Sequence, residues 1–242
     1  MDFKTHVAKY FEAHSDLLKK IQAFEQKRGI ALLKKLNRDK DKINLYSWLT
    51  EVKFGLWLDQ YSYELKHDAS IENKTPDWTA IINGQKVIAE VLRVNTPQEE
   101  LEANINQHEQ IRQYQDKNPG VWLILEGEAK MVPQVYVQRA ANKLREKSIK
   151  YGPIASKSNT PFLICVETTF NTFIDESDCF DLLIAHNTKG LLYSDADFSS
   201  NVTGVLLLTY FKEFFYFHNE LAENKLNQEN YDLFSKLAYW EK

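Results

Sequence analysis

The dipeptide Asn83-Gly84 constrains this chain more than any other feature, because it fixes how the residues on either side can pair. The flanking runs, 77–82 and 85–94, are rich in β-branched and aromatic residues, as β-strands are. Asn-Gly between two such runs predicts a two-residue type I′ hairpin turn, in which both turn residues have positive φ. Counting outward from this turn brings Asp77 opposite Glu90.

Two opposed carboxylates are the consequence of this register. Directly opposed side chains on one sheet face have Cβ atoms about 4.5–5.5 Å apart. Carboxylates at that distance repel each other unless a positive charge lies between them or one stays protonated. Taken singly, Asp77 reads as the acid of a Thr-Pro-Asp turn and Glu90 as a partner of a lysine from a covering helix. Since the two acids face each other, both of these separate interpretations would have to be true at once. The register therefore favours a divalent metal site.

Composition sets the broad class of the protein. A chain of 242 residues with 43% hydrophobic residues can form one large domain, or one domain with an appendage. The sequence has no apolar run near the roughly 18 residues of a membrane span and no basic-then-apolar leader, so we expect a soluble, cytoplasmic protein without membrane contact. The net charge of −4 still permits a local basic patch that contacts phosphate. Cys165, in a buried strand, and Cys179, in a polar loop, are expected to be reduced thiols.

Hydrophobic spacing predicts an α/β protein with a mixed β-sheet flanked by helices. We divide it into an N-terminal helical extension, 1–41, which could mediate a homodimer, and an α/β domain, 42–242. Helices are expected at 3–37, 42–60, 97–116, 134–150 and 220–242, with a shorter element at 180–185. Strands are expected at 61–65, 77–82, 85–94, 121–125, 161–167, 204–211 and 214–217, with a loop at 152–161.

The order of these elements, with Pro76-Asp77 opening one strand and Glu90-Val91-Leu92 in the next, resembles the PD-(D/E)XK nucleases. Glu51, on the preceding helix, stands where that family often has a further acid. The resemblance covers roughly residues 42–226. It implies a restriction-endonuclease-like fold and a metal-dependent endonuclease that acts on DNA. The resemblance also suggests a role in defence against foreign DNA. Asp77, Glu90, Glu51 and the Val91 carbonyl would hold Mg²⁺ or Mn²⁺.

Leu92 departs from the family pattern, which has a lysine two residues after the acid. Three explanations stay open: the lysine has moved to another element, the metal alone activates water, or the site is inactive and the fold is kept for binding. The best donor for a moved lysine is Lys147, with Lys143 and Lys150 behind it on the same helix. Lys86 lies on the correct strand face, but about 13 Å from Glu90 at ~3.3 Å per residue.

Other chemistries lack their motifs. The six histidines show no His-Glu-x-x-His spacing, and the sequence has neither a Gly-x-x-x-x-Gly-Lys phosphate loop nor a Gly-x-Ser-x-Gly elbow. The alternative to a nuclease is therefore a catalytically inactive nuclease-fold protein that binds nucleic acid or a protein partner. A structural subunit of a larger complex is a third possibility.

Overall fold

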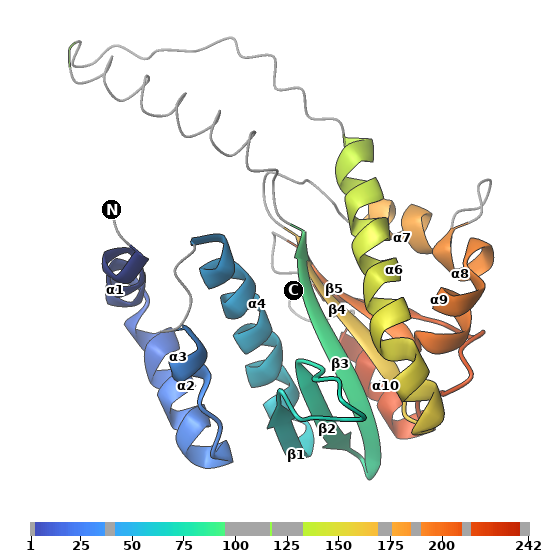
Figure 1. Ribbon diagram of the computed structural model, residues 1–242, viewed down its shortest axis with the longest axis horizontal. Helices are drawn as coiled ribbons and strands as arrows, with labels where there is room; N and C mark the ends of the chain where they lie inside the picture. Colours follow the sequence, from blue (N-terminus) through green and yellow to red (C-terminus); the bar gives the residue numbers. More distant parts are fainter. Residues whose placement is uncertain are drawn as a thin grey trace.

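The computed structural model describes residues 3–36, 42–94, 117, 133–168, 176–184, 190–209 and 214–237. Its centre is a six-stranded mixed β-sheet with helices on both faces (Figure 1), as the sequence predicts for the α/β class. The helix expected at 97–116 and the strand expected at 121–125 lie outside the described residues. Within the described ranges, no helix combines the length and apolarity needed to cross a membrane.

The strands follow one another across the sheet in chain order, β1 to β6. The first three are antiparallel neighbours: β1 (Ser62–His67), β2 (Trp78–Ile82) and β3 (Gln85–Val94). The middle of the sheet is parallel, from β3 through β4 (Phe162–Thr168) to β5 (Gly204–Leu208). The last strand, β6 (Phe214–His218), returns antiparallel to β5.

The predicted hairpin register is confirmed. Ile82 pairs with Gln85 and Thr79 with Ile88, and the ladder reaches Trp78 opposite Ala89. Asn83 and Gly84 have φ values of 46° and 71°, the left-handed region that the turn requires. One step beyond the last pair, Asp77 lies beside Glu90.

One face of the sheet packs against α4 (Lys42–Asp59), with α10 (Gln228–Leu237) farther along and three N-terminal helices behind α4. These are α1 (Phe3–Ala13), α2 (Ser15–Arg28) and α3 (Leu32–Leu36), which share one hydrophobic core with α4 and β2. The contact of α4 with β2 depends on Gly55, because a Cβ there would lie 2.1 Å from the Trp78 ring. The Trp78 indole N–H in turn donates to the Glu51 carbonyl at 3.0 Å. This close packing fixes Glu51 over the start of β2.

The other face packs against α6 (Pro133–Lys157), which crosses β3 and β4, and three shorter helices lie beyond α6 (Figure 1). The shorter helices are α7 (Glu176–Leu183), α8 (Leu191–Ser194) and α9 (Ala196–Asn201). Ile88 and Leu92 of β3 are buried in this second core. Glu90, between them, is fully buried and points to the same side. The acid therefore faces α6.

Several predicted element ends are wrong. The helix predicted over 3–37 is three helices, and α2 ends where Gly29 adopts φ 67° and donates to the Glu25 carbonyl at 2.8 Å. The loop predicted from 152 is helical to Lys157. Gly152 packs against Asn201 of α9, and the carbonyl that Pro153 leaves unpaired belongs to Ile149, on the exposed side of α6.

The predicted C-terminal helix begins late, at Gln228 rather than 220. The Asn219 side chain donates to the carbonyls of Ser199 and Val202 at 2.7 and 2.6 Å, and the Asn224 side chain donates to that of Ala155 at 3.1 Å. Such side chain–backbone bonds compete with helix formation. Cys179, predicted in a loop, is buried within α7, and neither cysteine forms a disulfide in the described part of the chain.

Candidate functional site

The two predicted acids converge. The Asp77 amide N–H donates to Glu90 Oε1 at 2.9 Å, and the Val91 amide N–H donates to Asp77 Oδ2 at 2.7 Å. Each carboxylate thus accepts a hydrogen bond from the backbone of the other's strand. The hairpin register holds the pair in place, because no side chain needs to reach far. These bonds also bring the Val91 backbone beside Asp77.

Lys147, on α6, forms an ion pair with Oε2 of Glu90 on β3. The Glu90 side chain is fully buried, whereas the Lys147 side chain keeps 26% of its surface exposed. The neighbouring lysines of α6 are engaged elsewhere: Lys143 donates to the Arg93 carbonyl at 2.9 Å, and Lys150 lies over the Tyr151 ring. Of the three lysines proposed from the sequence, Lys147 is therefore the one that the described contacts bring to the acids.

Leu92 is buried among the apolar residues that α6 covers. A lysine there would place its charge in this core, which is costly without a partner. The positive charge beside Glu90 comes instead from Lys147 of α6, the helix that covers this face of β3. The lysine that pairs with Glu90 thus comes from helix α6 and not from β3.

Tyr151, one helical turn after Lys147, was missed by the sequence analysis. Its buried hydroxyl donates to the Thr75 carbonyl at 3.1 Å and lies near the Glu90 carboxylate. Thr75 immediately precedes Pro76-Asp77, so this tyrosine ties α6 to the start of the acidic strand. The i, i+4 spacing from Lys147 was the only sequence signal for it.

Burial and mutual repulsion perturb the acids. Burial, followed by the charges of Glu90 and Glu51, raises the pKa of Asp77 to about 7. Burial also raises the pKa of Glu90, although Lys147 opposes the shift. Burial would lower the pKa of Lys147, but the charges of Glu90 and Asp77 outweigh it and raise that pKa. Lys147 therefore neutralises only part of the negative charge that the two acids would carry.

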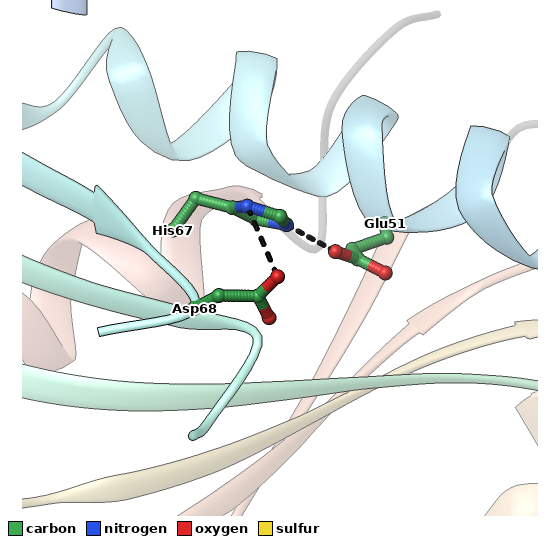
Figure 2. Close-up of side chains that lie close together, drawn as sticks. All are labelled: Glu51, His67 and Asp68. Carbon is green, nitrogen blue, oxygen red and sulfur yellow. Dashed lines mark hydrogen bonds and ion pairs between the residues drawn. The ribbon is translucent and has the colours of Figure 1, made fainter. Parts of the chain in front are cut away.

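Glu51 lies in a neighbouring cluster (Figure 2). Its carboxylate contacts His67 Nε2 and accepts a hydrogen bond from Lys35 of α3 at 2.9 Å. Asp68 approaches His67 Nδ1 at 3.5 Å and Lys35 at 3.2 Å. Burial alone would raise the pKa of Glu51, but the His67 hydrogen bond and the Lys35 charge lower it. Glu51 affects Asp77 through its charge, whereas the described contacts of its carboxylate are made within this second cluster.

His67, Asp68 and Lys35 were not predicted as site residues. One ligand atom from each of Glu51, His67 and Asp68 lies within 4.8 Å of the other two, a spacing that could hold a metal ion. Lys35 already provides a positive charge there. Because this residue comes from a segment sixteen positions before Glu51, only the folded packing of α3 on α4 could show it.

Comparisons of this chain with protein-family models, with curated proteins and with solved structures gave no match.

Proposed function

We propose that this chain is a metal-dependent nuclease that hydrolyses phosphodiester bonds in DNA. The observation that carries the proposal is the Asp77–Glu90 pair, cross-linked through its backbone and joined by Lys147. Strongly perturbed acids paired with a specific lysine are typical of functional sites. The described elements α4, β1–β3, α6 and β4 support the same proposal, because they stand in the order on which the resemblance to PD-(D/E)XK nucleases rests, although the helix and strand predicted between β3 and α6 lie outside the described residues.

The residues present fit a divalent cation. Carboxylate oxygens are the ligands that Mg²⁺ and Mn²⁺ prefer. A pKa near 7 for Asp77 means that the folded protein holds this carboxylate at a cost, which a second cation would relieve. Asp77 and Glu90 would bind the ion, the Val91 carbonyl would be a further ligand, and Glu51 would act directly or through a water molecule.

The bound ion would lower the pKa of the attacking water and polarise the phosphate. The protein's own residues orient the reaction. Lys147, held against Glu90 but partly exposed, would stabilise negative charge developing on the phosphoryl oxygens. Tyr151 acts through Thr75 as a positioning residue, since its hydroxyl holds the segment before β2 against α6.

Calorimetric titration of Mn²⁺ tests the cation site. Wild type should bind Mn²⁺, and Asp77→Asn, which keeps the side-chain size, should not. Asp232→Asn, at an exposed acid of α10, is the matched control and should bind as wild type does. At 100 times Kd, Mn²⁺ should stabilise wild type by about 2.7 kcal/mol. If Mn²⁺ produces no heat of binding with wild type and does not raise its free energy of unfolding, the metal site loses its support.

A plasmid-nicking assay tests the chemistry. Wild type should nick plasmid DNA with Mg²⁺ or Mn²⁺, and Lys147→Met should reduce the rate by a factor of the order of 10²–10³, the usual loss for one charge-stabilising group. Equal nicking by wild type and Lys147→Met would contradict the assigned role.

The second candidate is a catalytically inactive member that binds nucleic acid or a protein partner. The Lys147–Glu90 ion pair favours it, because it neutralises one carboxylate without any metal. DNA binding by wild type with neither nicking nor Mn²⁺ binding would select this candidate over the nuclease.

A further inference from the structure

A hollow of about 280 Å³ lies on the sheet face that carries Asp77 and Glu90. Its floor and sides come from all three antiparallel strands, with Lys66 of β1, Thr79 of β2 and Lys86 of β3 among them. Segment 69–71, before the Ile71–Lys74 bridge, closes one side. Thr79 is two residues from Asp77, and Lys86 is four from Glu90, so each belongs to the same strand face as its neighbouring acid.

The charged rim of the hollow is positive. Lys66 pairs with Glu64 at 2.5 Å, and the two side chains are 62% and 43% exposed. Lys86 is exposed and forms no ion pair with any residue that the structure describes. Two lysines and one glutamate leave a single uncompensated positive charge, next to the hydroxyl groups of Ser70 and Thr79. This combination suits an anion that also accepts hydrogen bonds.

The remaining wall is apolar. Ala69, Ile71 and Ile81 line it, so the hollow offers a non-polar surface beside its positive rim. A phosphate with an attached sugar and base presents the matching surfaces, since the phosphate is anionic and the sugar and base have non-polar faces. The volume of the hollow lies just below the lower end of the usual range for small-ligand pockets, so the hollow suits one nucleotide rather than a larger ligand.

We propose that this hollow binds a nucleotide of the nucleic-acid strand that occupies the Asp77–Glu90 site, with Lys86 as its phosphate contact. This inference rests on the proposed nuclease function. Strand geometry sets the spacing: four residues at ~3.3 Å put Lys86 about 13 Å along β3 from Glu90. A nucleic-acid strand has one phosphate per about 3.4 Å of helix axis, so the two points are a few nucleotides apart.

The experiment measures binding of a fluorescent single-stranded DNA oligonucleotide without divalent metal, so that no cleavage can occur. The variants are Lys86→Ala, Thr79→Val and Lys236→Ala, the last at an exposed lysine of α10 on the opposite face. Lys86→Ala removes the proposed phosphate contact. It should lower the slope of log Kd against log salt by about 0.7–0.9 and weaken binding about five- to eightfold at 0.1 M salt. Lys236→Ala should leave both unchanged.

Binding and cleavage separate this inference from the proposed function. If Lys86→Ala weakens oligonucleotide binding but wild type never nicks DNA, the subsite stands and the nuclease fails. If wild type nicks DNA while Lys86→Ala keeps the wild-type Kd and salt slope, the subsite is refuted and the nuclease stands. Equal competition by poly-glutamate at matched charge would also overturn the inference, because the hollow would then accept any polyanion, including an acidic protein segment.

Discussion

Asp77→Asn should stabilise the metal-free protein at neutral and higher pH. Asparagine has nearly the same shape, and its carbonyl oxygen can still accept the 2.7 Å hydrogen bond from the Val91 amide. The change removes a carboxyl that the fold holds close to Glu90. It therefore isolates the electrostatic cost of keeping that carboxyl ionised.

The magnitude follows from the pKa of Asp77, raised from 3.8 to about 7 by burial, Glu90 and Glu51. A group whose pKa is higher in the folded state binds protons more tightly there, so stability falls as pH rises between the two values. At about 1.4 kcal/mol per pKa unit, the full loss by pH 7 is up to about 4 kcal/mol. The loss shrinks towards pH 4 and vanishes only well below pH 3.8, where the carboxyl is protonated in both states.

The assay is urea denaturation of wild type and Asp77→Asn from pH 4 to pH 8 in a chelating buffer, with Asp232→Asn as the control. The two curves should lie closest near pH 4 and separate as the pH rises, with Asp77→Asn the more stable. Added Mn²⁺ should then stabilise wild type alone. A constant difference between wild type and Asp77→Asn across this pH range would refute the reasoning, because it would show no titration of Asp77.

Three further substitutions probe the surroundings of the site. Gly55→Ala should destabilise the protein by about 1–3 kcal/mol, since its Cβ would overlap the Trp78 ring; a urea midpoint like that of wild type would contradict this packing. Lys147→Met should lower the free energy of unfolding by about 3 kcal/mol at pH 7, because the buried Glu90 loses its partner. The loss should be smaller at pH 5, where Glu90 can take up a proton, and the same denaturation series measures it. Tyr151→Phe should cost about 1 kcal/mol through the lost hydrogen bond to Thr75, and no loss would mean that water replaces the hydroxyl.

The sequence predicted the acidic pair because the signal was local. Asn83-Gly84 admits essentially one hairpin turn, and strand alternation then assigns every side chain to a face. Lys147 could be selected only as the best of several helix lysines, because its contact with Glu90 depends on how α6 crosses β3. The structure supplied that crossing.

The features that the sequence did not reveal depend on contacts between distant segments. The helical run through Gly152 and Pro153 contradicts local propensity, but Gly152 packs against α9. The non-helical tail before Gln228 is held by asparagine side chains that bond to carbonyls far away in the chain. The partners of Glu51 come from two other segments, so no local spacing could name His67 or Lys35.

The position of Lys35 gives the N-terminal helices a chemical role. Leu32 and Leu36 anchor α3 in the core, and the lysine between them reaches the Glu51 carboxylate. Detaching α3 would leave His67 as the one basic partner of the Glu51 carboxylate among the described residues, and the pKa of Glu51 would rise. Since the charge of Glu51 also acts on Asp77, the acid–base behaviour of the hairpin depends on whether the first helices are docked.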